Sequence, residues 1–338
     1  MKKIFLAVMA IAALAACSKD EQIAAPKGEA IAFGDAFVDN ATRADYTSGK
    51  TVEKFQVWGT VQGTHANPAA PVYIFDGDEV NSTGIVNDEE TTVNYGQAWF
   101  CENVQYWVPN AKYAFTAIVD GKFTKTNNVY DHATIPFTVD DGDRNKDLLL
   151  ATATASVAND GTVSAGESSD SEISDGLVKF KFSHLLSKLQ FNAPEHNYGN
   201  GYSVVVTDIE VTGVLNNGVY TIANGGSWAK AQGAQTNVTL NFPAGDGGDF
   251  ETRQILPIAQ VLTVTITYNV EFGDTVISKD VTKSGQISNG TDSNGDPIGY
   301  TFNKGYVYAI TPNITANQIN FTVATVDGWT PGSGINVQ

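Results

Sequence analysis

The chain has 338 residues, with 20 Lys plus Arg against 37 Asp plus Glu, which gives a formal net charge of −17 at pH 7. Nucleic-acid phosphates repel a surface of this sign, and an anionic lipid surface does not attract it electrostatically, so we expect no nucleic-acid partner. A chain of this length is more often two domains than one.

The first residues predict an export signal. The pair Lys2-Lys3 precedes an apolar run, residues 4–13, that is too short for a stable membrane span. The run leads to Leu14-Ala15-Ala16-Cys17, which resembles a bacterial lipobox. We therefore expect residues 1–16 to be a removed lipoprotein signal peptide, and Cys17 to carry a palmitate-type lipid anchor in the outer membrane. The alternative is an ordinary signal peptide with an incidental cysteine.

Residues 17–43 are expected to contain a lipid tether and a short strand. The polar residues 18–27 predict a flexible tether, and "EAIAFGDAF" (29–37) predicts an apolar strand. Arg43 follows in "NATRAD", whose small residues carry no packing pattern and indicate an exposed, cleavable loop. Arg144 and Arg253 are the other two arginines of the chain. A plain surface arginine is the alternative interpretation of Arg43.

Alternation of apolar and polar residues predicts β-strands along the rest of the chain. The clearest run is "LTVTITYNVEF" (262–272), in which every second residue from Leu262 to Phe272 is apolar. Shorter runs of this kind lie at 55–61, 112–119, 178–183 and 237–242. The stretch 182–191 fits one helical turn or a bent strand. Because Gly- and Asn-rich turns separate these runs, the sequence predicts an all-β protein built as β-sandwiches.

One stretch predicts a domain boundary. Residues 156–176 hold six serines and many acids but no aromatic residue, so they cannot bury much surface. We expect an N-terminal sandwich at 44–160, a linker at 161–176 and a C-terminal sandwich at 177–338. The chain ends with an alternating apolar run, Ile319, Phe321 and Val323, which is followed by Trp329.

The sequence offers little evidence for a chemical site. The four histidines form no zinc-binding pair, and no nucleophile or phosphate-binding motif occurs. Asp141, Asp143, Asn145 and Asp147 are spaced like the start of a calcium loop, but Lys146 stands where Gly is needed. A solvated turn is therefore the preferred interpretation, and we expect no catalytic residue, no metal and no cofactor.

The remaining candidates have structural alternatives. The five tryptophans fit core or rim packing better than a sugar platform. Cys101, which is alone once Cys17 is lipidated, is expected to pack as a small apolar residue. Asp274-Thr275-Val276 matches a short O-glycosylation acceptor, but the pattern is too short to be specific.

Taken in chain order, these segments resemble the fimbrillin family, the lipoprotein pilins of Bacteroidales type V pili. The resemblance is carried by the lipobox at Cys17, "IAF…ATRAD" (31–45), "FQVWGT" (55–60), "AWFCENVQYWVPNAKYAFTAIV" (98–119), "DLLLATA" (147–153), "FKFSHLLSKLQF" (180–191) and "INFTVATVDGW" (319–329).

The resemblance implies two transthyretin-like β-sandwich domains in tandem and no enzyme activity. It implies a structural subunit of a cell-surface fimbria that contributes to adhesion and whose partners are other fimbrial subunits, in a homo- or heteropolymer. It further implies that an Arg-specific protease cuts between Arg43 and Ala44. The cut would release the strand that carries Ile31, Phe33 and Phe37, together with the lipid anchor.

Strand physics then predicts an assembly mechanism. Loss of the strand exposes a sheet edge and an apolar groove, which a strand of the next subunit fills by β-strand addition. Ile319, Phe321 and Val323, with Trp329 as an anchor, are candidate donor residues; an ordinary last strand is the equal alternative. Because donor and groove are different surfaces, the contact does not close and builds a filament. The rival interpretations are a monomeric surface lipoprotein that binds glycan or host protein, and a glycan-degrading enzyme.

Overall fold

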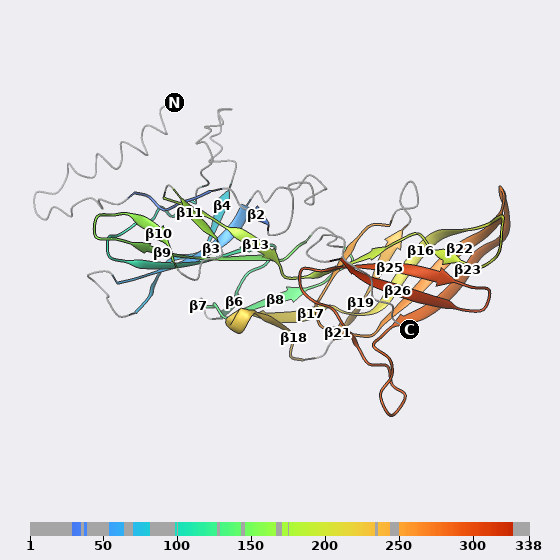
Figure 1. Cartoon of the computed structure of the whole chain (residues 1–338). Helices are drawn as coiled ribbons and strands as arrows, with labels where there is room; N and C mark the ends of the chain where they lie inside the picture. Colours follow the sequence, from blue (N-terminus) through green and yellow to red (C-terminus); the bar gives the residue numbers. More distant parts are fainter. Residues whose placement is uncertain are drawn as a thin grey trace, which may run out of the picture.

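The computed structural model describes residues 29–34, 37–38, 54–63, 70–81, 99, 101–126, 129–142, 146–166, 171–174, 176–233, 236–243 and 250–326. Over these ranges the protein is all-β, as the alternation predicts, with a short 3-10 helix at Ala223–Gly225 and no α-helix. None of these residues belongs to a helix that is long and apolar enough to cross a bilayer. Figure 1 shows an elongated molecule with the N-terminal strands at one end and the C-terminal strands at the other.

Two sheets form the N-terminal half. Their strands are β1 (Ala32–Phe33), β2 (Phe37–Val38), β3 (Lys54–Gln62), β4 (Val72–Asn81), β5 (Lys112–Val119), β9 (Leu149–Val157), β10 (Val163–Ala165), β11 (Glu172–Ser174), β12 (Leu177–Lys179) and β13 (Lys181–His184). Among the described residues, the larger sheet has the order β2-β13-β9-β5-β3-β4, with β10 beside β9. The smaller sheet has the order β1-β12-β11.

The buried faces of these two sheets meet in one core. This first core consists of Ile31, Phe33, Phe55, Val57, Val61, Phe75, Val80, Trp99, Trp107, Ala111, Tyr113, Phe115, Ala117, Val119, Leu149, Ala151, Ala153, Ala155, Val157, Val178, Phe180 and Phe182. Phe33 of the smaller sheet contacts Phe55 of the larger sheet, with ring centroids 5.9 Å apart. Face-to-face contact of this kind is the packing of a β-sandwich.

The C-terminal half contains longer strands. They are β14 (Ser187–Phe191), β15 (Glu195–His196), β16 (Tyr202–Leu215), β19 (Asn237–Pro243), β20 (Arg253–Ile255), β21 (Ala259–Gln260), β22 (Leu262–Phe272), β23 (Thr275–Ile287), β24 (Tyr300–Thr301), β25 (Val307–Ile314) and β26 (Ile319–Val326). One sheet has the order β19-β16-β22-β23, and another has the order β15-β25-β14-β20 with β26 beside β25; β21 pairs with β24.

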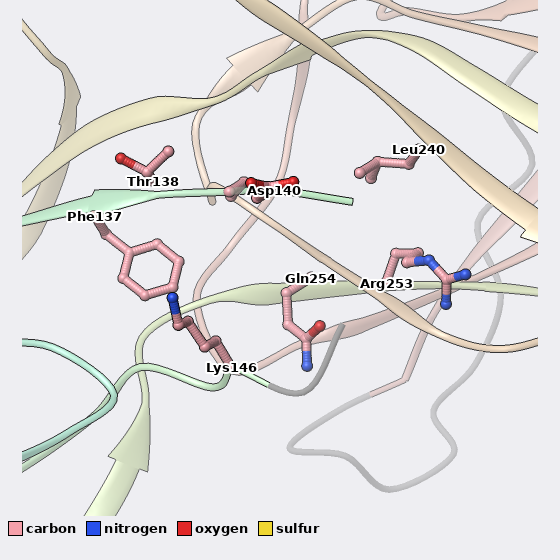
Figure 2. A pocket seen from close by; sticks show the side chains of 8 residues that line it. Phe137, Thr138, Asp140, Lys146, Leu240, Arg253 and Gln254 are labelled. Atoms are coloured by element: carbon pink, nitrogen blue, oxygen red, sulfur yellow. The ribbon is translucent and has the colours of Figure 1, made fainter. Parts of the chain in front are cut away.

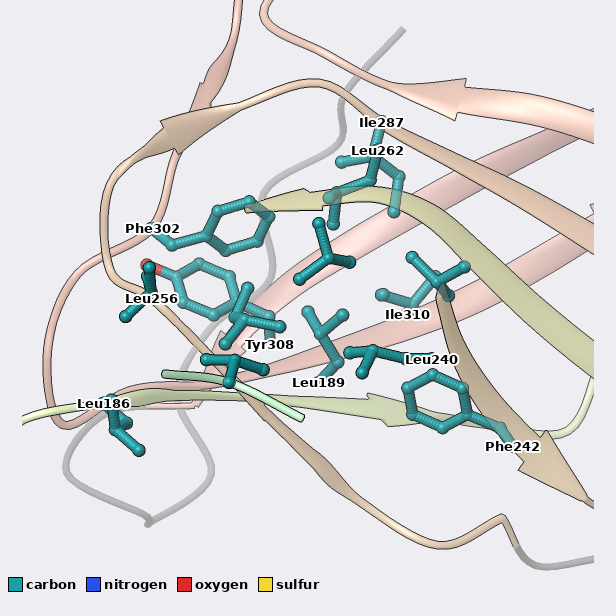
Figure 3. Packing of buried hydrophobic residues seen from close by; sticks show 14 of the residues in the cluster. Leu186, Leu189, Leu240, Phe242, Leu256, Leu262, Ile287, Phe302, Tyr308 and Ile310 are labelled. Carbon is teal, nitrogen blue, oxygen red and sulfur yellow. The ribbon is translucent and has the colours of Figure 1, made fainter. Parts of the chain in front are cut away.

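A shared sheet joins the two halves. It contains β8 (Thr134–Thr138), β17 (Asn217–Thr221) and β18 (Ser227–Lys230), in the order β18-β17-β8, and the hairpin β6 (Thr124–Thr126) and β7 (Val129–Asp131) precedes β8. The second core likewise draws on both halves. Figure 3 shows its C-terminal members, among them Leu186, Leu189, Leu240, Phe242, Leu256, Leu262, Ile287, Phe302, Tyr308 and Ile310. The second core also contains residues of the N-terminal half, namely Trp58, Ile118, Phe123, Ile135, Phe137, Val139 and Leu148.

The predicted strands compare closely with the observed ones. The alternating runs 55–61, 112–119, 237–242 and 262–272 are strands, but Phe272, expected on the buried face of β22, is 52% exposed beside the Gly273 turn. The stretch 182–191 is the bent-strand alternative, because β13 and β14 follow one another with a break at Leu185-Leu186. Strands β12 and β13, which we expected to begin the C-terminal domain, pair with β1, β2 and β9.

Candidate functional site

The candidate site is the place that the N-terminal strand segment 29–34 occupies inside the first core. Ile31 is 6% exposed and Phe33 is 1% exposed. Farther along, the backbone of Phe37 pairs with Lys181 in the parallel β2–β13 contact. The segment that is predicted to be removable is therefore integral to the N-terminal sandwich as the chain stands.

Backbone hydrogen bonds hold this segment on both of its edges. On one edge the bonds run to residues 99–107: Ile31 N–H to Gln105 O (2.7 Å), Trp99 N–H to Phe33 O (2.6 Å) and Trp107 N–H to Glu29 O (2.9 Å). On the other edge β1 runs parallel to β12, with Ala32 opposite Leu177 and Phe33 opposite Val178. We call the space between β12 and residues 99–107, which residues 29–34 fill, the slot.

Aromatic rings line the bottom of the slot. The Phe33 ring contacts Phe55, Phe75, Phe115 and Phe180, with centroid distances of 5.9, 5.6, 6.4 and 5.8 Å. Burial of Ile31 and of Phe33 stabilises the fold by roughly 1.5–3 kcal/mol for each side chain. If the segment left, the four rings that now contact Phe33 would face water, so the emptied slot favours a new apolar occupant.

The exit of the slot is narrow at Gly34. A Cβ atom at this position would lie 2.7 Å from Cγ of Lys179, closer than carbon atoms pack. The Lys179 ammonium lies 3.7 Å from the Glu172 carboxylate. Glycine thus lets the chain leave the slot beneath the lysine side chain.

Cys101 lies in the wall of the slot formed by residues 99–107. It is half-buried against the first core, and its Sγ donates a hydrogen bond to Asn103 O over 3.2 Å. Burial, with a smaller contribution from Asp78, raises the pKa of the Cys101 thiol to about 11. The thiol is therefore neutral at physiological pH and behaves as the small apolar residue that the sequence predicts.

The predicted donor residues lie in the second core of the same subunit. Ile319, Phe321 and Val323 are 6%, 6% and 1% exposed. They belong to β26, which pairs antiparallel with β25 from Ile314↔Ile319 to Val307↔Val326. In the single subunit this run is thus the last strand among the described residues. The prediction that it acts as a donor concerns the assembled state, so it stays a prediction.

Several predicted site residues have no described surroundings. Cys17, Arg43, Ala44 and Trp329 lie outside the described residues, as does Arg144. Arg253 is described, and it is only 2% exposed.

Arg253 makes a buried ionic contact that the sequence did not suggest. Its guanidinium lies 2.9 Å from Glu251 and 3.5 Å from Asp141, and it donates to Asn241 O over 2.6 Å. Figure 2 shows Arg253 beside a cavity of about 10 Å³, which is about the size of one water molecule. The cavity is too small for a substrate, and a protease cannot reach the buried guanidinium in the folded chain.

The described acidic residues of the candidate calcium loop, Asp141 and Asp147, do not point to a common site. Asp141 accepts the Asn241 backbone N–H over 3.0 Å and pairs with Arg253, whereas the Asp147 carboxylate lies 2.8 Å from Nδ1 of His184. The preferred interpretation as a solvated turn was wrong for Asp147, which is 9% exposed, because His184 draws the carboxylate inward. No group of three metal-ligating side chains gathers among the described residues.

The tryptophans pack as the sequence predicts where they are described. Trp58, Trp99 and Trp107 are at most 8% exposed, and Trp228 donates its indole N–H to Leu185 O over 2.7 Å. These rings belong to the cores or pack against them and form no open sugar platform.

Comparisons with known proteins agree with this architecture. The model of the fimbrillin-like family matches residues 42–329, so the strand segment 29–38 precedes the matched span. A search of curated proteins returns no match.

Solved structures share the fold. A fimbrial protein from Bacteroides vulgatus matches with a TM-score of 0.53 and 17% identity, over 88% of this chain and 99% of that chain. A proposed cell adhesion protein from Bacteroides uniformis matches with a TM-score of 0.51 and 14% identity, over 90% of this chain and 100% of that chain. A third structure, of a proposed cell adhesion protein from Bacteroides ovatus, matches with a TM-score of 0.51 and 17% identity, over 89% of this chain and 96% of that chain. At these identities the likeness concerns the fold alone.

Proposed function

Because the chain belongs to the fimbrillin-like family, we propose that it is a structural subunit of a cell-surface fimbria and contributes to adhesion. This is a family of fimbrial structural proteins rather than of enzymes. The single observation that carries the proposal is the slot, in which a short N-terminal strand is paired on both edges and buries Phe33 among four aromatic rings.

Two transthyretin-like sandwiches in tandem are the domain organisation that we propose. The first core supports this division, because all of its members lie in the N-terminal half, whereas the second core also contains Trp58 and other N-terminal residues. The pairing of β12 and β13 with the N-terminal strands favours a boundary after His184, later than the linker at 161–176 that the composition suggests.

The proposed maturation begins with lipidation of Cys17, which anchors the precursor in the outer membrane. An Arg-specific protease then cuts between Arg43 and Ala44 and frees the strand from the body of the protein. Two observations support this choice of arginine. The family match begins at residue 42, next to the proposed cut, and Arg253 is buried in ion pairs and so protected.

The proposed assembly is strand exchange. Once residues 29–38 leave, backbone groups on both edges of the slot lose their partners, and unsatisfied buried groups of this kind are costly. A strand of a neighbouring subunit, from the same or another fimbrial protein, restores the hydrogen bonds and covers the aromatic rings. Repetition of this one-way contact builds a filament.

Limited proteolysis of the unlipidated chain tests the proposal. Treatment with an Arg-specific protease is expected to release one N-terminal fragment ending at Arg43 and to convert the monomer into a high-mass polymer, seen by size-exclusion chromatography. A trimmed protein that stays monomeric and is retained by immobilised polysaccharide would favour a monomeric binding protein instead.

A further inference from the structure

We propose that the end of the β22–β23 hairpin docks on the outside of the slot wall of the next subunit in the filament. We call the hairpin end the tip patch, which consists of Tyr202, Phe272, Val276 and Ile277. Its partner is the wall patch of a second copy, which consists of Val72, Val104 and Val108. The inference rests on the proposed function, because it concerns two subunits of one filament.

The tip patch contains an exposed aromatic ring with a fixed position. Phe272 is 52% exposed and ends the alternating run of β22. Its ring lies 5.0 Å from the ring of Tyr202 and covers Gly201, where a Cβ atom would come within 2.9 Å of Phe272. Because neighbouring atoms already hold the ring in place, a partner that binds it has little side-chain entropy to remove.

A β-bulge adds two aliphatic side chains to the tip patch. Val276 and Ser278 oppose two consecutive residues of β22, so Ile277 between them is an extra residue in this register. Val276 and Ile277 are 48% and 51% exposed. Among the described residues β23 is the last strand of its sheet, so this aliphatic pair lies at an open edge. Apolar side chains gathered at such an edge mark a surface for association.

The wall patch lies on the outside of the slot. Val104 belongs to the wall and Val108 follows it directly, and their side chains are 54% and 38% exposed. Asn103 donates its side-chain amide to Ile74 O over 2.8 Å, which holds the wall against β4, where Val72 is 45% exposed. The patch is therefore continuous with the slot, which is the proposed contact between subunits.

Charge favours this pairing between two copies. The chain carries a formal net charge of −17, so two copies repel each other wherever acidic surfaces meet. The stretch 103–111 of the wall contains no charged residue, and neither does the stretch 202–207 at the tip. Glu271 and Asp274, which flank the tip patch, thus meet no carboxylate on residues 103–111.

The two patches lie toward opposite ends of the elongated molecule. Figure 1 shows β22 and β23 at the C-terminal end, and β4 at the N-terminal end. In a filament built by a one-way contact, the C-terminal end of one subunit meets the N-terminal end of the next. Strand exchange and patch contact then join the same two neighbours, and each contact raises the effective concentration for the other.

A charge swap across the contact tests the inference. In the unlipidated chain that begins at Ser18, Ile277→Glu is expected to slow polymer growth after Arg-specific cleavage by roughly tenfold, because a carboxylate then enters the apolar contact. Val108→Lys should slow growth in the same way. The double variant should regain most of the parent rate, since the two charges pair across the contact. Light scattering measures the growth rate.

Ile298→Glu is the matched control. Ile298 is 43% exposed and belongs to neither patch, so this variant adds the same charge and should grow at the parent rate. Phe272→Ser is a second tip variant that adds no charge and should also slow growth. All uncut variants should keep the melting temperature of the parent, because the substituted side chains are exposed.

Three outcomes overturn the inference. Parent-like growth of both Ile277→Glu and Phe272→Ser would show that the tip makes no contact in the filament, while the fimbrial function would stand. Slow growth of Ile277→Glu that Val108→Lys does not restore would show that the tip contacts a surface other than the wall patch. If the parent chain formed no polymer after cleavage, the proposed function would fail, and this inference with it.

Discussion

Phe33 stacks on Phe180, with ring centroids 5.8 Å apart and ring planes 17° apart. Phe33 precedes the proposed cleavage site at Arg43, whereas Phe180 follows it. Cleavage would therefore separate two halves of one aromatic contact that the uncut chain holds together. The stability of the precursor and the driving force for assembly then depend on the same side chains.

Phe33→Ala should destabilise the uncut chain strongly. Removal of a buried phenylalanine that leaves a cavity costs about 3–5 kcal/mol of unfolding free energy. Urea unfolding of the unlipidated precursor measures the loss. The control is Phe272→Ala, whose side chain is 52% exposed, with an expected change of about 0.5 kcal/mol or less. Equal losses in the two variants would contradict the role of Phe33 in the slot.

Arg43→Ala should give a folded monomer that an Arg-specific protease does not convert into polymer. The reason is that the slot stays filled by residues 29–34 when the chain is not cut. Thr42→Ala, the neighbouring control, should be cut and should assemble as the parent does. Mass spectrometry of the N-terminus and size-exclusion chromatography check both. A lowered melting temperature of Arg43→Ala would instead indicate a structural arginine.

Arg253→Met should lower the stability of the monomer without changing its cleavage. The substitution removes the guanidinium that lies 3.5 Å from Asp141 and leaves the Asn241 carbonyl without this donor, which is expected to cost about 1–3 kcal/mol. Lys54→Met is the control. The Lys54 side chain is 65% exposed and that of its partner Glu79 is 49% exposed, and exposed ion pairs contribute only about 0–1 kcal/mol to the free energy of unfolding. Denaturant unfolding should separate the two variants clearly; similar small losses would mean that the buried pair contributes little.

Alkylation of Cys101 should report whether the slot is filled. Burial raises the pKa of this thiol from 9.0 to about 11, so below pH 9 the uncut chain holds very little thiolate. Opening of the slot restores water near residues 99–107, and the pKa should fall toward its ordinary value. Iodoacetamide labelling at pH 8 should therefore be slow before cleavage, faster in freshly cut monomer and slow again in polymer. An unchanged rate across the three states would argue against opening at this wall.

Lys283→Met tests the predicted donor role of β26: if β26 is the donor strand, this variant should speed assembly after cleavage. The Lys283 ammonium donates to Thr315 O over 2.8 Å and to Ala316 O over 2.7 Å, in the turn that leads into β26. Loss of these charge-assisted bonds should ease release of the strand, and we expect roughly several-fold faster polymer growth by light scattering. Lys279→Met lies on the same strand, is 74% exposed and should not change the rate. Slower growth of Lys283→Met would argue that β26 stays in place.

The sequence predicted the strands well but not their partners. The strands at 262–272 and 112–119 could be predicted because the alternation of apolar and polar residues is a local pattern, which is visible in the sequence of each strand by itself. Nothing local showed that β8 would pair with β17 of the other half, or that β12 would form one edge of the slot. For the other edge of the slot, the aromatic residues of "AWFCENVQYW" (98–107) were the available signal in the sequence, because they indicate a segment that packs against a core.

The sequence alone determined the β character, the acidic surface and the apolar Ile-x-Phe pattern of residues 31–33, since these follow from residue types and their spacing. Only the tertiary structure decided that these residues occupy a two-edged position among four aromatic rings, and that Arg253 is hidden. The physical reason is that strand pairing and burial join residues far apart in the chain, whose meeting depends on the packing of the whole.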